Sequence, residues 1–236
     1  MNRQTDRCSI RDEEREIRIK GVIIGMIPVL IMAIVLFGSS GDGDWMIAWI
    51  FIGIHTCATI ILSFSLDVTL ITERSTQGAD MKRWDQILVK LLTLSGLLIL
   101  LVAGLDHRFH ITPSIPFTVQ TPGIVLFILG YGLLIWAAES NAFFSAVVRI
   151  QHDRGHHVIS RGPYRFVRHP GYSGLILCMI AEPLMFQSLM AGIPCIMTIG
   201  LLVWRTWRED RTLSEELGGY DEYSGVVPFR LVPGVW

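Results

Sequence analysis

The chain has 236 residues, of which 51% are hydrophobic and 17% are charged. Soluble domains carry about 25% charged residues on average, so this composition argues against an ordinary soluble domain and favours a membrane protein. The net charge of −1 at pH 7 argues against nucleic acid or another polyanion as a partner.

In chain order, four apolar runs approach the roughly 20 residues that a helix needs to cross a bilayer core. They cover residues 21–38, 45–66, 87–105 and 122–138, the last with a polar extension to residue 148. A fifth apolar region, residues 172–204, is too long for one straight span and contains Glu182-Pro183. Because proline removes a backbone donor and disfavours helix in the residue before it, we predict a helical hairpin that bends at residues 182–187. One long kinked helix is the alternative.

The predicted fold is therefore all-α, a polytopic integral membrane bundle of about six spans with a C-terminal helical hairpin. Lysine and arginine divide unevenly between alternate loops and tails, with 18 in one set and 1 in the other. Basic loops remain in the cytoplasm, so we expect both termini there, in a bacterial inner membrane or one like the endoplasmic reticulum. Oligomeric state is not indicated.

We divide this single membrane domain into a scaffold, residues 1–138, and a catalytic half, residues 139–236, because the residues that can carry chemistry gather after Glu139. Glu139 itself follows the fourth apolar run. An ionisable group at that depth usually faces a cavity or a partner, although headgroup water is an equally good explanation.

The segment from Arg161 to Tyr172 is basic, aromatic and rich in turn residues. Gly162-Pro163 and Pro170-Gly171 are turn dipeptides that bracket three further candidates, Tyr164, Arg168 and His169. Arginine binds carboxylates through a planar fork, and histidine titrates near neutrality. The pattern indicates a site for a polar, partly anionic small molecule at the membrane surface. A basic loop that only touches anionic lipid is the alternative.

Two further clusters have simple structural explanations. Arg205 and Glu209 lie four residues apart and share a helix face, which is also typical of an exposed, salt-bridged helix end. The histidines of the 151–157 segment lack an accompanying cysteine, and Arg154 among them opposes a cation, so we expect no metal site.

The ordered series of these motifs resembles the isoprenylcysteine carboxyl methyltransferase family, which is related to the phospholipid N-methyltransferases. The resemblance extends from about Asn141 to the C-terminus and includes Tyr220-x-x-Tyr223 and Arg230-Leu-Val-Pro233. It implies a membrane methyltransferase that uses S-adenosylmethionine, with a cofactor pocket open to the cytosol and a lipophilic substrate that enters from the bilayer.

By motif, the resemblance places cofactor binding on two elements. The Arg-His-Pro-x-Tyr element falls on Arg168, His169, Pro170 and Tyr172. The acidic pair, usually Glu-Glu, falls on Glu209 and Asp210, where Asp210 departs from the family pattern.

The chemistry of S-adenosylmethionine suits these residue types. Arg168 and His169 match its carboxylate and Glu209 its ammonium or ribose. Tyr164, Tyr172 or Trp207 offers a ring to adenine or to the sulfonium. An acceptor carboxylate is already ionised at neutral pH and needs no general base.

We therefore expect Arg205, or next Arg161, to hold an acceptor carboxylate. If the acceptor is instead an amine, Glu139 or His169 becomes the candidate base. The sequence thus predicts a methyltransferase for a lipophilic acceptor and favours an isoprenylcysteine-like carboxylate as that acceptor. An amine N-methyltransferase and a non-catalytic protein that binds anionic lipid are the alternatives.

Overall fold

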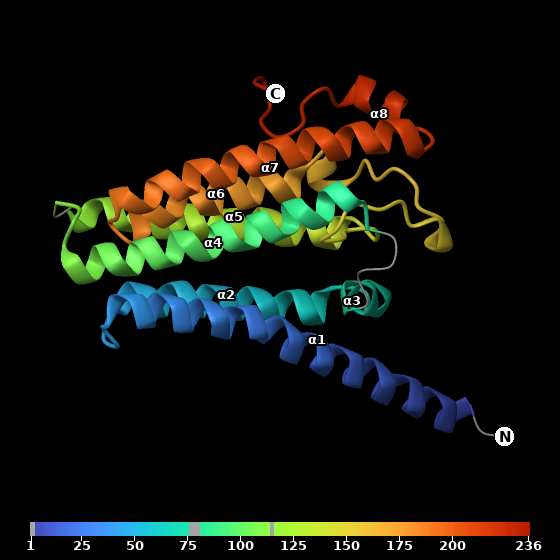
Figure 1. The fold of residues 1–236 in the computed structure, drawn as a ribbon. Helices are drawn as coiled ribbons and strands as arrows, with labels where there is room; N and C mark the ends of the chain where they lie inside the picture. Colours follow the sequence, from blue (N-terminus) through green and yellow to red (C-terminus); the bar gives the residue numbers. More distant parts are fainter. Residues whose placement is uncertain (1–2, 76–80, 114–115) are drawn as a thin grey trace.

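The computed structural model describes residues 3–75, 81–113 and 116–236. In the described residues the regular structure is helical, and six helices run side by side along one axis (Figure 1). The helices of this bundle are α1 (Arg3–Ser40), α2 (Met46–Ser65), α4 (Arg83–Phe109), α5 (Phe117–Ser140), α6 (Pro170–Met185) and α7 (Leu189–Glu216). The short α3 (Val68–Ser75) and α8 (Tyr220–Val226) lie outside it. The predicted all-α bundle is confirmed.

Among the described residues, five helices are long and apolar enough to cross a membrane, compared with the six or so spans that the sequence predicted. They are α1 from Asp12, α2, α4, α5 from Thr118, and α7. The sixth bundle helix, α6, has only 16 residues. Together they make the chain a multi-pass membrane protein.

The predicted hairpin is present as α6 and α7, which are joined by residues 186–188. Ser188 caps α7 by accepting a hydrogen bond from the amide of Ala191, and its own hydroxyl donates to Asp106 at the end of α4. The turn of the hairpin is therefore tied to a neighbouring span.

Small residues set the packing of α5 against α6. A Cβ on Gly130 would lie 2.6 Å from the Cys178 sulfur and 2.7 Å from the Gly174 carbonyl, and a Cβ on Gly174 would lie 2.6 Å from the Gly130 carbonyl. Small side chains let membrane helices approach closely. This contact fixes the start of α6, and with it the loop that precedes α6.

One expectation about α5 was wrong. The polar extension to residue 148 is not helical, because α5 ends at Ser140. Asn141 accepts a hydrogen bond from the amide of Phe143 through its side chain, and such local bonds compete with the helix. The segment 141–169 instead folds over the end of the bundle with two short 3₁₀ turns, His152–Arg154 and Gly162–Arg165.

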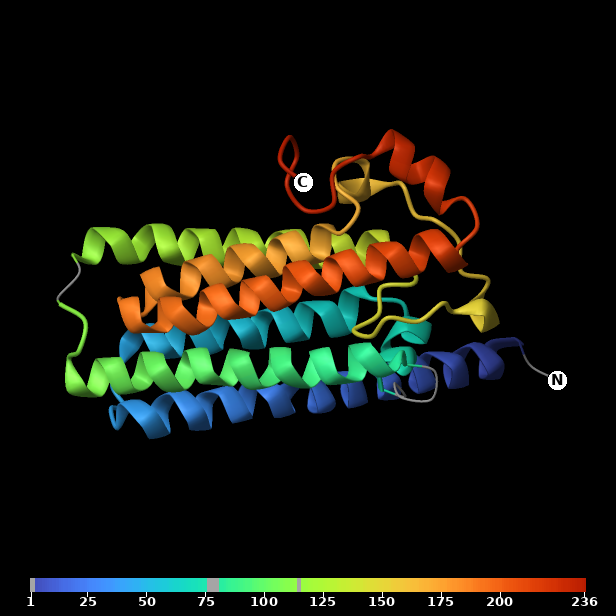
Figure 2. The same ribbon diagram turned by 45° about the horizontal axis from the view of Figure 1, so that its top comes forward.

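The basic segments gather at one end of the bundle. The start of α1, the 141–169 segment, the end of α7 and α8 all lie at that end, whereas the turn after α1 and the hairpin turn lie at the other (Figures 1 and 2). The C-terminal tail returns to the start of α6, where the amides of Arg168 and His169 donate to the carbonyls of Phe229 and Arg230.

Candidate active site

A half-open cavity lies at this end of the bundle, between the 141–169 segment, the start of α6, the end of α7 and α8. Its empty volume is about 830 Å³ including the mouth. Its polar lining comes chiefly from Asn141, Arg149, His156, Arg168, His169 and Glu209. Its apolar and aromatic lining includes Phe143, Val158, Tyr164, Tyr172, Leu213 and Tyr220.

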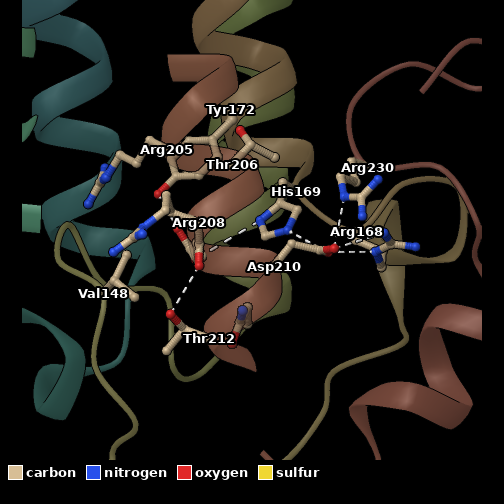
Figure 3. Close-up of polar contacts among 12 residues, drawn as sticks. Val148, Arg168, His169, Tyr172, Arg205, Thr206, Arg208, Asp210, Thr212 and Arg230 are labelled. Carbon is tan, nitrogen blue, oxygen red and sulfur yellow. Dashed lines mark hydrogen bonds and ion pairs between the residues drawn. The ribbon is translucent and has the colours of Figure 1, made fainter. Parts of the chain in front are cut away.

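Asp210 is a buried centre of hydrogen bonds beside the cavity. Arg168 donates to both of its carboxylate oxygens, at 2.8 and 3.1 Å, and Arg230 and the Tyr220 hydroxyl each donate at 2.8 Å. His169 Nε2 lies 3.3 Å from Oδ1 of Asp210. Figure 3 shows Arg168 and His169, from the loop before α6, and Arg230, from the tail, converging on Asp210 of α7. Asp210 therefore holds the surrounding residues in place.

Glu209 lies on the opposite side of the His169 ring from Asp210 and lines the cavity. Its Oε2 accepts a hydrogen bond of 2.5 Å from the Tyr172 hydroxyl, and its Oε1 lies 4.0 Å from Nδ1 of His169. The rings of His169 and Tyr172 stack at 5.8 Å with planes 4° apart. The Oε2 atom of Glu209 is thus held by Tyr172, and its Oε1 atom faces the cavity beside the His169 imidazole.

The carboxylate of Asp85, on the first turn of α4, meets Arg205 behind this wall. Arg205 donates to both oxygens of Asp85, at 2.8 and 3.0 Å, and also to the carbonyl of Ala146 at 2.7 Å. The amide of Val148 donates to Asp85 at 2.7 Å. The Arg205 guanidinium lies over the ring of Tyr172, 5.4 Å from its centroid.

Phenols form much of the remaining wall. Asn141 donates to the Tyr164 hydroxyl at 3.2 Å, and the Tyr223 hydroxyl donates to the Tyr164 carbonyl at 2.7 Å. Burial raises the pKa of Tyr164 and Tyr220, and it raises that of Tyr223 to about 12. These rings are therefore neutral at physiological pH and offer faces and hydroxyls to a ligand.

The 141–169 segment also supplies a histidine to the cavity. The His156 ring packs against Phe143 at 4.5 Å, and its Nδ1 accepts a hydrogen bond from the Gln151 amide. Burial, together with the positive charges of His157, His152, Arg154 and Arg149, lowers the pKa of His156 to about 4. His156 is thus a neutral hydrogen-bonding group near pH 7.

The structure brings together five of the predicted residues: Tyr164, Arg168, His169, Tyr172 and Glu209 all line the cavity. Asp210 is behind the lining and bonds to Arg168 and His169, and Pro170 is the buried first residue of α6.

The candidate acceptor-binding and base residues are elsewhere. Arg205 is buried against Asp85, Arg161 is exposed and donates to the Ser140 carbonyl at 2.9 Å, and Glu139 is exposed at the end of α5. None of the three is part of the cavity lining.

Sequence reasoning did not identify Asp85, Arg149 or His156 as site residues. An acidic residue in the first turn of a helix is ordinarily explained by the helix dipole, so Asp85 carried no separate signal. Arg149 was counted only among the loop charges, and His156 was considered only as a metal ligand, which the sequence argued against. Their place in the wall depends on how the 141–169 segment folds back.

Comparison with known proteins points to one family. Residues 123–215 match the isoprenylcysteine carboxyl methyltransferase (ICMT) family. A probable protein-S-isoprenylcysteine O-methyltransferase of Oryza sativa subsp. japonica is 29% identical over 112 residues, which cover 44% of this chain and 56% of the relative. Protein-S-isoprenylcysteine O-methyltransferase B of Arabidopsis thaliana is 28% identical over 116 residues, 45% of this chain and 55% of the relative.

The chain thus spans about half the length of the curated relatives that it matches. The matched residues include the start of α6 and the end of α7, which carry His169 and Glu209. The resemblance to the isoprenylcysteine carboxyl methyltransferase family that the motifs predicted is therefore confirmed, over residues 123–215.

Proposed function

We propose that this chain is a membrane-embedded methyltransferase that uses S-adenosylmethionine to methylate the carboxylate of a lipophilic, isoprenylcysteine-like acceptor. The observation that carries the proposal is that His169 and Glu209, far apart in sequence, line one cavity at the end of a membrane bundle. The names of the relatives, which are O-methyltransferases of isoprenylcysteine, support carboxylate rather than amine chemistry.

The lining residues fit the methyl donor. Glu209 presents an oxygen to the cavity, which suits an ammonium or ribose hydroxyl, and Tyr164 and Tyr220 offer rings to a base or to a cation. Arg168 is 7% exposed, and its Nε, Nη1 and Nη2 atoms all donate within the protein. We therefore assign Arg168 the part of a fixed positive charge beside the donor carboxylate, with His169 as the direct contact.

When bound, the donor supplies a methyl group on a sulfonium, which an acceptor oxygen attacks in line. The protein has to align the reacting atoms and exclude water, and positioning can lower the barrier greatly. The acceptor carboxylate is ionised near pH 7, so no residue has to remove a proton.

The acceptor is best placed on the side of the cavity formed by the 141–169 segment. Arg205 and Arg161, which the sequence favoured for the acceptor carboxylate, do not line the cavity, whereas Arg149 does. We therefore propose Arg149 as the charge that faces an acceptor carboxylate, while Phe143 and Phe144 provide apolar surface for its tail. For an amine acceptor the base would be His169, because Glu139 is outside the cavity.

The proposed location follows from the charged loops. The basic segments share the end of the bundle that holds the cavity (Figure 2), so we propose that this end, with both termini, faces the cytoplasm. The membrane is a bacterial inner membrane or one like the endoplasmic reticulum.

The direct test combines donor binding with product analysis. Purified protein in detergent should bind radiolabelled S-adenosylmethionine, and membranes containing it should transfer label to a prenylated cysteine with a free carboxylate. A methyl ester releases labelled methanol in base, whereas a methylated amine keeps its label. Folded protein that binds no donor contradicts the proposal, and base-stable label identifies the amine alternative.

A further inference from the structure

We propose that Asp85, on the scaffold helix α4, is a positioning residue for the donor-binding wall and sets the place of Glu209 through Arg205 and Tyr172. The inference rests on the proposed function of the cavity. Asp85 lies outside residues 123–215, which match the family, so the family match assigns it no role.

The Asp85 carboxylate is fully enclosed by protein and well supplied with donors. It has 0% exposure and accepts three hydrogen bonds, two from Arg205 and one from the Val148 amide. Two elements that are distant in sequence, α7 and the 141–169 segment, therefore meet on one side chain of α4. A buried ion pair is weak evidence for stability, because desolvation offsets much of the attraction. A geometric role explains the pair better.

The first connection from Asp85 to the cavity runs along α7. Asp85 accepts hydrogen bonds from Nε and Nη2 of Arg205, and this guanidinium lies over the ring of Tyr172, 5.4 Å from its centroid. The Tyr172 hydroxyl donates to Glu209 at 2.5 Å. The orientation of the Glu209 carboxylate thus depends on the ring that Arg205 holds.

The second connection runs through the cavity wall itself. Val147 and Val148 line the cavity. The ion pair bonds the backbone on both sides of Val147: Asp85 accepts from the Val148 amide, and Arg205 donates to the Ala146 carbonyl. The same ion pair therefore holds the wall that faces Glu209.

The test uses the full chain in lipid nanodiscs, labelled with 3-fluorotyrosine. The chain has five tyrosines, and the Tyr172 signal is identified by its loss in Tyr172→Phe. Asp85→Asn keeps the shape of the side chain and removes its charge. Asp44→Asn, an exposed position at the opposite end of the bundle, is the matched control. Arg205→Lys keeps the charge but loses the planar fork, and it replaces Asp85→Asn if that variant does not fold.

We expect Asp85→Asn or Arg205→Lys to shift or broaden the Tyr172 fluorine signal without donor, and Asp44→Asn to leave it unchanged. Binding of S-adenosylmethionine should weaken by about tenfold or more in Asp85→Asn. In the Tyr172→Phe background the same change should cost less than in the wild type, because the connection through Tyr172 is already broken and coupled residues are not additive.

Two results overturn the proposal. One is an unchanged Tyr172 signal. The other is a loss of donor binding in the Asp85→Asn, Tyr172→Phe double variant that equals the product of the two single losses. A purely structural role for Asp85 predicts the second of these. If the folded wild type binds no donor but its Tyr172 signal still responds to Asp85→Asn, the proposed function fails while the positioning role stands.

Discussion

At the scale of single residues, the adjacent acids Glu209 and Asp210 have different surroundings. Asp210 faces Arg168, Arg230, Tyr220 and His169 and is 7% exposed. Glu209 has one hydrogen bond, from Tyr172, and lines the cavity. Because successive residues of a helix point about 100° apart, one acid faces the tail and the other the cavity. We therefore expect Asp210 to act on stability and Glu209 on binding.

The two acids can be separated by mutation. Glu209→Gln should weaken donor binding more than tenfold, a loss above about 1.4 kcal/mol, with little change in thermal unfolding. His169→Ala should cause a similar loss. Glu215→Ala is the control, because Glu215 pairs only with the exposed Arg211 in the described structure. Equal binding by Glu209→Gln and wild type would remove Glu209 from the site.

Asp210→Ala should instead unfold at lower temperature. It leaves the buried Arg168 without its carboxylate, and breaking a buried pair costs about 3–5 kcal/mol. Thermal unfolding in detergent measures the change. A variant with unchanged stability and abolished donor binding would show that Asp210 contacts the donor directly.

At the scale of elements, the contact between α5 and α6 and the 141–169 segment determine the site. Gly130 and Gly174 allow the two helices to touch, which positions His169 at the start of α6. The segment is held from within by Gln151, which is 0% exposed and donates to the Phe143 carbonyl at 2.9 Å. The α5–α6 contact and the 141–169 segment thus together determine the shape of the cavity.

Gly130→Ala should destabilise the bundle by about 1–3 kcal/mol, the usual cost of overpacking. Its new methyl group would overlap the backbone of α6, whereas a Cβ on Gly132, two residues further along α5, meets nothing within 4 Å. Gly132→Ala is therefore the matched control. Equal thermal unfolding of the two variants would contradict the close contact.

The 141–169 segment should loosen in acid. Burial lowers the pKa of His156 from its ordinary value of 6.5 to about 4 when the segment is folded over the bundle. Between these pH values, His156 is protonated when the segment detaches and neutral when it is folded. The neutral His156 therefore stabilises the folded segment fully above pH 6.5, and this stabilisation is lost as the pH falls from 6.5 towards 4. After correction for the intrinsic exchange rate at each pH, the opening constant that hydrogen exchange gives for this segment should therefore rise as the pH falls from 7 to 5. His156→Asn should flatten that dependence, and an unchanged slope would assign it to another group.

At the scale of the whole molecule, the bundle has two chemically different ends. The cavity and the basic segments share one end, and the acidic turn with Asp42 and Asp44 lies at the other (Figure 1). Large apolar side chains are exposed along the bundle helices, for example Ile23, Leu94 and Ile196. The orientation that we propose, with the cavity on the cytoplasmic side, rests on this asymmetry.

Cysteine labelling in intact cells tests that orientation. A membrane-impermeant maleimide should react with Asp44→Cys from outside, and with Glu222→Cys on α8 only after permeabilisation. The unsubstituted chain, which already has four cysteines, measures background. The reverse pattern would place the cavity on the outer face.

The sequence predicted the spans, the hairpin and the family because each depends on local signals. Apolar length marks a span, Glu182-Pro183 marks the bend, and the 161–172 segment carries its own motif. The short helices α3 and α8 were missed, because at 8 and 7 residues they are too brief for an apolar pattern to mark them. The division into a scaffold, residues 1–138, and a catalytic half, residues 139–236, stays a prediction, and the contact of Asp85 with Arg205 joins the two parts.

By itself the sequence determined that this is a helical membrane protein with a motif of the isoprenylcysteine carboxyl methyltransferase family. Only the tertiary structure decided which charges line the cavity and which are bound behind it. Arg205 and Glu209 share one helix, yet the first is held by Asp85 and the second faces the cavity. The physical reason is that a charge near hydrocarbon is governed by the partner it reaches, and that partner comes from a distant part of the chain.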